Sequence, residues 1–99
     1  MLDKLYLIDL YDIYGSLLTE KQQNYFEDYY FDNLSLKEIS ENNSVSRNAI
    51  HNSIKETEEK LKNYELNLKI HQKNKKIKEI INMIEQEEIK KELERIIEE

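Results

Sequence analysis

Apolar residues recur at the spacing of an α-helix along most of the chain. In the N-terminal part this spacing predicts a mostly apolar helix over residues 2–18, with Gly15 near its end. A second apolar group, rich in aromatic side chains, predicts another helix that stops near Asp32 and Asn33.

Residues suited to cap helices divide the chain into further elements. Thr19 and Ser35 each stand three residues before a Gln or Glu, which is the spacing of a capping box. Ser46 is a third N-cap candidate, because an apolar helical run begins shortly after it. We therefore expect a short helix after Ser35, a turn at residues 42–44 and a long helix from Ser46 through Tyr64.

The second predicted helix carries a dense aromatic cluster. Its members are Tyr25, Phe26, Tyr29, Tyr30 and Phe31. Such a cluster can stack on nucleic-acid bases, but stacking surfaces usually include nearby Lys or Arg. Acidic residues accompany this cluster instead, so we predict that it packs in the core.

The C-terminal part contains a basic run followed by an isoleucine-rich stripe. No acidic residue interrupts the run of cations at Lys69, His71, Lys73, Lys75, Lys76 and Lys78, which forms either a hinge or a helical continuation. The stripe comprises Ile77, Ile80, Ile81, Ile84, Ile89, Leu93, Ile96 and Ile97. So narrow a stripe requires a partner helix, from the same chain or from a second copy in a homodimer. We expect one domain over residues 1–68 and a helical extension over residues 69–99.

Composition supports an all-α protein and excludes several functional classes. The 99 residues include one glycine and no proline, which favours long helices, and no cysteine, which excludes disulfides and thiolate chemistry. No apolar stretch is long enough to span a bilayer, and Asp3 stands where a secretory signal carries positive charge, so we expect a cytoplasmic protein. No nucleophile, phosphate loop or metal cluster can be assembled, so we expect no catalysis, no cofactor and no bound metal.

Charge is distributed unevenly along the chain. The formal net charge is −6, and the first third is its acidic part. Four carboxylates there, Asp3, Asp9, Asp12 and Glu20, have no residues to orient them as a metal or acid–base site. We interpret them as a solvated acidic face that could also contact a basic partner.

Residues 35–61 have the order of parts of a helix-turn-helix. Ser40 is small where two helices must approach, Val45 anchors the turn, and Ile50 with Ile54 holds the second helix against the core. The exposed face of that helix is then expected to present Arg47, Asn48, His51, Asn52 and Lys55, residue types that contact phosphates or base edges. An αα corner that only packs a core is the other interpretation, and the glutamates at 56, 58 and 59 would repel phosphate.

The basic run is a second candidate for phosphate binding. Its lysines are Lys69, Lys73, Lys75, Lys76 and Lys78. They either grip phosphates, with a salt-dependent affinity, or form the solvated end of a helix.

The segment LTEKQQNYFEDYYFDNLSLKEISENNSVSRNAIHNSIKETEEKLKNYE, residues 18–65, resembles region 4 of bacterial sigma factors. Together with MLDKLYLIDLYDIYGSLLTEKQ before it, the chain resembles the YlxM family over about residues 1–68. Asn43 departs from the family pattern, which has an apolar residue there, and Ser44 stands where Asn or Gly would ease a left-handed turn.

The YlxM resemblance implies a sigma region 4-like helix-turn-helix bundle with a non-enzymatic accessory role in the signal recognition particle pathway. The implied partner is the particle's GTPase or its RNA. The alternative hypothesis is a transcriptional regulator that binds DNA through the helix-turn-helix, and a third is a helical scaffold that self-associates through the isoleucine stripe.

Overall fold

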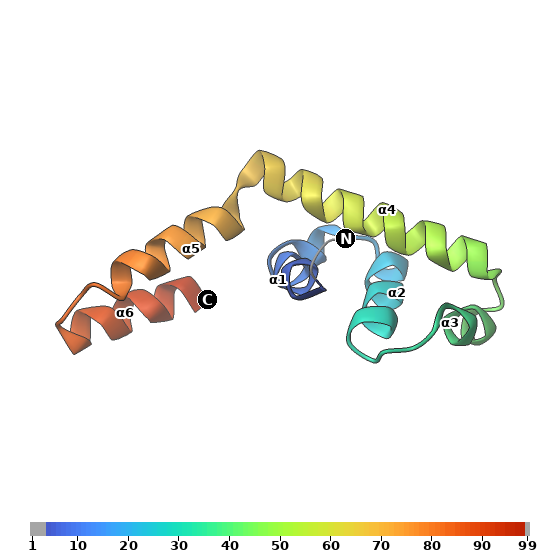
Figure 1. Ribbon diagram of the computed structural model, residues 1–99, viewed down its shortest axis with the longest axis horizontal. Coiled ribbons are helices and arrows are strands. Elements are labelled where there is room, and N and C mark those ends of the chain that lie inside the picture. The colour runs from blue at the N-terminus through green and yellow to red at the C-terminus, as the bar shows by residue number, and fades with distance from the viewer. Residues whose placement is uncertain (1–3, 99) are drawn as a thin grey trace.

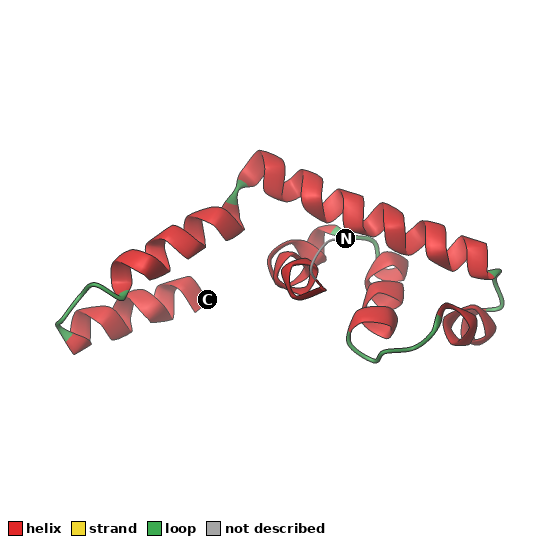
Figure 2. Ribbon diagram, viewed as in Figure 1, coloured by secondary structure: helices red, strands yellow, loops and turns green. Residues whose placement is uncertain are grey.

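The computed structural model describes residues 4–98, which form helices and no strands (Figures 1 and 2). The α-helices are α1 (Lys4–Tyr14), α2 (Glu20–Tyr30), α3 (Leu36–Asn43), α4 (Arg47–Leu68), α5 (Ile70–Ile81) and α6 (Glu87–Glu98). A 3₁₀ turn, η1 (Gly15–Leu17), follows α1. The prediction of an all-α helix-turn-helix protein with a C-terminal helical extension is confirmed.

The predicted caps start the helices where the sequence places them. Thr19 and Ser35 each form a complete capping box, and the Ser46 hydroxyl accepts the amide of Ala49 at 3.1 Å. The predicted helix over residues 2–18 is wrong at its C-terminal end, because the chain tightens into η1 after Tyr14. Leu2, the predicted start, lies outside the described residues.

The long helix α4 contacts each of the three preceding helices, and α1, α2 and α3 pack along one side of it (Figure 1). Its inward line, formed by Ile50, Ile54 and Leu61, is at most 5% exposed. The apolar face of α1, represented by Leu7 and Leu10, meets the same core. Burial of apolar surface between α4 and the other helices therefore holds the N-terminal bundle together.

Aromatic rings fill the centre of this bundle. Phe26 is 0% exposed and lies between the rings of Tyr11 and Tyr30, with both pairs of ring centroids 4.4 Å apart. Glycine at position 15 suits the same packing, because a Cβ atom there would lie in tight contact, 3.1 Å, with the ring of Tyr11. The core interpretation of the aromatic cluster is confirmed for its buried members, Tyr25, Phe26 and Tyr30.

The turn between α3 and α4 has a left-handed residue at Ser44, with φ 56° and ψ 40°. The Val45 amide donates back to the Ser40 carbonyl at 3.1 Å, which is the long bond of a Schellman motif. The prediction of a turn at residues 42–44 is wrong at its start, because α3 continues through Asn43. The Asn43 side chain donates to the Ile39 carbonyl at 2.8 Å and so supports the last helical turn.

Replacing Ser44 with Gly is expected to stabilise the protein. A left-handed backbone costs a non-glycine residue about 1 kcal/mol, and the greater freedom of glycine in the unfolded chain offsets part of the gain. We expect the free energy of unfolding in urea to rise by about 0.5 kcal/mol. Ser44→Val should lower it, since a β-branched residue tolerates this backbone poorly, and equal stabilities of the two variants would contradict the role assigned to the turn.

The basic run proves to be both a hinge and a helix. Lys69 has φ 56° and ends α4, after which α5 starts at once in a new direction (Figure 1). The chain then turns at residues 82–86, and α6 runs back antiparallel to α5. The isoleucine stripe thus finds a partner helix in the same chain, with Ile81 2% exposed.

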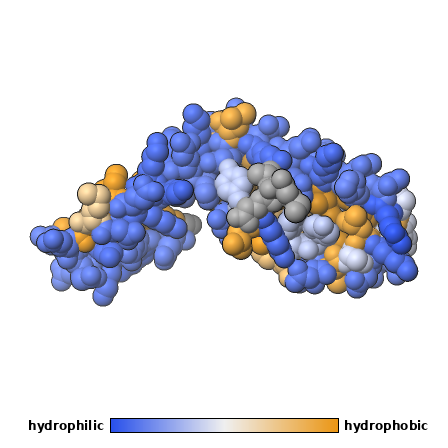
Figure 3. All heavy atoms as spheres, viewed as in Figure 1, coloured by the Kyte–Doolittle hydropathy of each residue, from blue (hydrophilic) through white to orange (hydrophobic). Residues whose placement is uncertain are grey.

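The hairpin of α5 and α6 also leaves apolar side chains exposed. Ile80, Ile89 and Ile96 are each about half or more exposed, and apolar atoms are visible on the hairpin in Figure 3. Pairing of two copies through this stripe stays a prediction, as does the division of the chain into a domain over residues 1–68 and an extension over residues 69–99. The described residues measure 54 Å along the longest axis and 25 Å across, and none of their helices has the length and apolarity that crossing a membrane requires.

Candidate nucleic-acid interface

The first three turns of α4 present to solvent the residues that were predicted to contact nucleic acid. We call them the reading face. All five predicted residues, Arg47, Asn48, His51, Asn52 and Lys55, are exposed. At 100° per residue, the buried Ile50 and Ile54 place Asn52 and Lys55 on the side away from the core. The helix-turn-helix therefore directs a face of amide and cationic groups outward.

Arg47 and His51 lie towards one border of this face. His51 lines a hollow of about 250 Å³ together with Leu36 at the start of α3 and Tyr29 of α2.

Tyr29 is 37% exposed and Phe31 is 44% exposed, so the prediction that the whole aromatic cluster packs in the core is wrong for these two. Both lie at the end of α2, where neighbouring helices no longer cover every side.

Electrostatics confine the cationic part of the face to the beginning of α4. Within residues 4–98, neither Arg47 nor Lys55 forms an ion pair. Glu56, directly after Lys55, and Glu59, one turn beyond it, are exposed, whereas Glu58 accepts a hydrogen bond from the Tyr30 hydroxyl. A phosphate backbone would therefore be attracted to the first turns of α4 and repelled beyond them.

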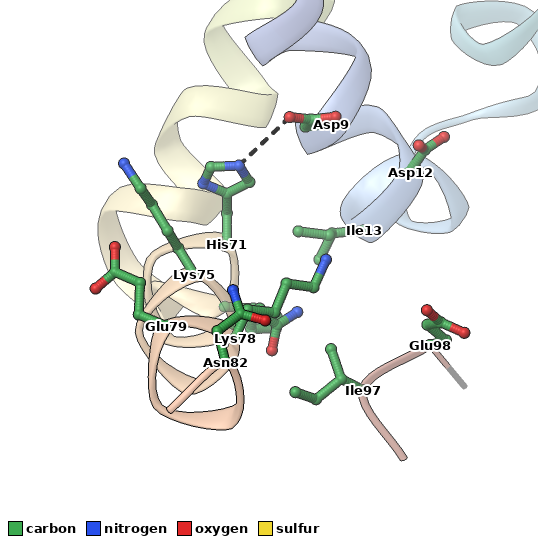
Figure 4. Close-up of a pocket in the computed structure, with 12 residues that line it drawn as sticks. Asp9, Asp12, Ile13, His71, Lys75, Lys78, Glu79, Asn82, Ile97 and Glu98 are labelled. Carbon is green, nitrogen blue, oxygen red and sulfur yellow. Dashed lines mark ion pairs between the residues drawn. The ribbon is translucent and has the colours of Figure 1, made fainter. Parts of the chain in front are cut away.

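The helix α5 divides the basic run between two sides. Lys75 and Lys78 line a groove of about 990 Å³ between α1 and the hairpin, together with Asp9 and Asp12 (Figure 4). Lys73 and Lys76 are exposed elsewhere on α5, because their positions on the helix place them on another side. The five lysines thus do not form one continuous surface, and their binding of phosphate stays a prediction.

His71, which the sequence places among these cations, turns inward and joins α5 to α1. Its Nε2 lies 3.6 Å from a carboxylate oxygen of Asp9 (Figure 4). Its ring meets the ring of Tyr6 edge to face, with centroids 5.3 Å apart. Asp9 and Asp12 are exposed, as predicted for an acidic face, whereas Asp3 lies outside the described residues.

A buried polar cluster holds the bend between α4 and α5. The Tyr14 hydroxyl donates to Glu65 at 2.6 Å and accepts the Ile70 amide at 3.1 Å. The Glu65 carboxylate accepts the amides of His71 and Gln72, each at 3.0 Å. Glu65 thus caps the start of α5 from within α4, where Lys69 offers no side-chain cap.

Hydrogen bonding keeps the Glu65 carboxylate ionised. Burial raises the pKa of this carboxyl, but the bonds from Tyr14 and from the two amides outweigh burial and leave the pKa below its ordinary value. Burial and the neighbouring Glu65 together raise the pKa of the Tyr14 phenol, so its proton stays in place. The sequence interpretation missed this cluster. The sequence feature that could have indicated it is the position of Glu65, which continues the buried line of Ile54 and Leu61 on α4.

Comparisons with known proteins agree with the architecture. A family model named UPF0122 and described as helix-turn-helix protein, YlxM / p13 like, matches residues 1–99. The chain is 44% identical to a UPF0122 protein of Fusobacterium nucleatum over 92 residues, which is 93% of this chain and 89% of the relative. It is also 44% identical to one of Ureaplasma urealyticum over 91 residues, 92% of each chain.

A third relative, from Desulforamulus reducens, is 48% identical over 80 residues, which is 77% of this chain and 68% of that protein. The family match also includes residues 69–99, beyond the point where the resemblance noted in the sequence ended.

Proposed function

Because this chain belongs to the UPF0122 family of YlxM / p13 like helix-turn-helix proteins, we propose that it is a non-enzymatic protein that acts by binding nucleic acid. The observation that carries the proposal is the outward face at the start of α4. Arg47, Asn52 and Lys55 are exposed there without an ion pair in the described part of the chain, on a helix whose opposite side is locked into the core. A second helix fixed in this way is the element that helix-turn-helix proteins use for recognition.

The more specific proposal is an accessory role in the signal recognition particle pathway, with the particle's RNA or its GTPase as the direct partner. This role comes from the YlxM resemblance. It is supported by the small extent of the cationic face, which is bounded by the exposed Glu56 and Glu59. A protein that follows the backbone of long duplex DNA usually carries a more extensive basic surface.

The alternative is a transcriptional regulator that binds duplex DNA. The residue types on α4 favour it, because Asn bonds to adenine and Arg to guanine at the floor of the major groove. In this alternative, α4 enters the groove with its N-terminal end.

An equilibrium binding experiment distinguishes these proposals. Fluorescence anisotropy would compare the particle RNA, a duplex DNA and the particle GTPase as ligands for the full chain and for Arg47→Ala. We expect salt-dependent binding of the RNA that Arg47→Ala weakens about tenfold. The matched control is Arg95→Ala on α6, whose exposed ion pair with Glu92 contributes little.

Tighter binding of duplex DNA than of the RNA, again lost in Arg47→Ala, would favour the transcriptional alternative. If neither nucleic acid binds in a salt-dependent way, the proposal of nucleic-acid binding is wrong. Binding of the GTPase alone, with equal affinity for both variants, would move the function to a protein partner.

A further inference from the structure

A second hollow lies at the bend between α4 and α5, away from the reading face. It has a volume of about 490 Å³. Its lining combines three lysines with a tyrosine ring and an amide: Tyr6, Lys62, Glu65, Leu66, Lys69, His71, Gln72 and Lys75. We infer that this bend hollow binds one unpaired nucleotide of a single-stranded nucleic acid, with the phosphate on the lysines and the base against Tyr6. The inference rests on the proposed nucleic-acid binding and adds a second contact to it.

The three lysines come from separate parts of the chain. Lys62 lies on the last turns of α4, Lys69 is the left-handed residue of the bend, and Lys75 is on α5. Because the bend changes the direction of the chain at Lys69, it brings an α4 lysine and an α5 lysine to one hollow. In Figure 4 the Lys75 side chain extends past His71, away from Ile97 and Glu98. The three lysines meet only because the chain bends at Lys69, so the order of residues in the sequence does not reveal that they lie together.

Among residues 4–98, Glu65 is the only carboxylate that lines the hollow, and it is already engaged. Both oxygens of Glu65 accept hydrogen bonds, from Tyr14 and from the amides of His71 and Gln72. Within residues 4–98 none of the three lysines forms an ion pair. The ammonium groups are thus available to an anion, and the hollow lacks the exposed glutamates that follow the reading face along α4.

The aromatic wall favours a nucleotide over a simple anion. Tyr6 is half-buried, and the edge-to-face contact with His71 fixes its ring. Aromatic rings beside cations are the arrangement by which single-strand binders hold bases and phosphates together. The volume of the hollow suits a single nucleotide, whereas a duplex, with its bases paired inside the stack, could offer only phosphates. An acidic peptide would use the lysines but not the ring.

Anisotropy with a fluorescent eight-nucleotide oligouridine tests the inference on the full chain. We expect the double variant Lys62→Gln/Lys75→Gln to bind about tenfold more weakly and with a smaller dependence on salt. Tyr6→Leu should weaken binding fivefold or more, and Tyr6→Phe, which keeps the ring, should bind like the original chain. Thermal melting would verify that each variant is folded.

The matched control is Lys90→Gln/Lys91→Gln, which removes the same charge from α6, outside both the hollow and the basic run. Equal losses in the two lysine double variants would show that only net charge matters and would overturn the inference. Tighter displacement by octaglutamate than by uridine monophosphate would assign the hollow to an acidic peptide and would also overturn it. A parallel titration with oligodeoxythymidine shows whether the hollow binds RNA or DNA more tightly.

The same measurements separate the inference from the proposed function. If Arg47→Ala weakens binding of nucleic acid but Lys62→Gln/Lys75→Gln does not, the bend hollow is not a binding site and the reading face remains. If the hollow variants alone weaken binding, the inference holds and the reading face has been misassigned.

Discussion

Replacing Phe26 with Ala is expected to lower the free energy of unfolding by about 3–5 kcal/mol, the usual range for removing a fully buried phenylalanine. The ring is 0% exposed and stacks between Tyr11 and Tyr30, so its loss leaves a cavity that α1 and α2 cannot close without moving other helices. Small domains have only about 5–15 kcal/mol of total stability. A large share of the free energy of unfolding would therefore be lost, and urea titration followed by circular dichroism would measure the change.

Phe31→Ala is the matched control, since it removes the same atoms from another phenylalanine of the same aromatic cluster. Phe31 is 44% exposed, so we expect a loss of about 1 kcal/mol or less. Similar losses for the two variants would contradict the division of the aromatic cluster into buried and exposed members.

Glu65→Ala is expected to have the second largest effect, a loss of about 3 kcal/mol. Removing one partner of a buried charged network leaves the others without bonds, and here the Tyr14 hydroxyl and the amides of His71 and Gln72 would lose their acceptor. We expect faster hydrogen exchange at those two amides as well, because the start of α5 would lose its cap. Glu59→Ala, on the exposed side of α4, should change stability little.

The dependence of stability on pH gives an independent readout of this cluster. The pKa of Glu65 is lower in the folded chain than its ordinary value of about 4.5. The carboxylate therefore contributes its stability above the ordinary pKa, and the contribution is lost as pH falls through the lower folded pKa. We expect Glu65→Gln to be less stable than the original chain at neutral pH, with the difference shrinking in acid. A difference that stays constant below pH 4 would contradict the assignment.

The local features of the fold could be predicted because short-range chemistry dictates them. Thr19, Ser35 and Ser46 cap helices through bonds that span three residues, so no distant contact is needed to place them. The exposure of Asn52 and Lys55 likewise follows from the phase that the buried Ile50 and Ile54 impose on α4. The order of the helices and the outward face were therefore predictable from the sequence.

The bend at Lys69 could not be predicted in the same way. No local rule makes lysine adopt a left-handed backbone. The groups that cap α5 come from Glu65 and from Tyr14, and Tyr14 stands 56 residues before Ile70, whose amide donates to it. The sequence by itself determined most of the helices, their caps and the outward face of α4, because these depend on neighbours within one or two turns. Only the tertiary structure decided that the hinge would place Lys62 and Lys75 beside Tyr6 in one hollow, because that convergence depends on packing between α1, α4 and α5.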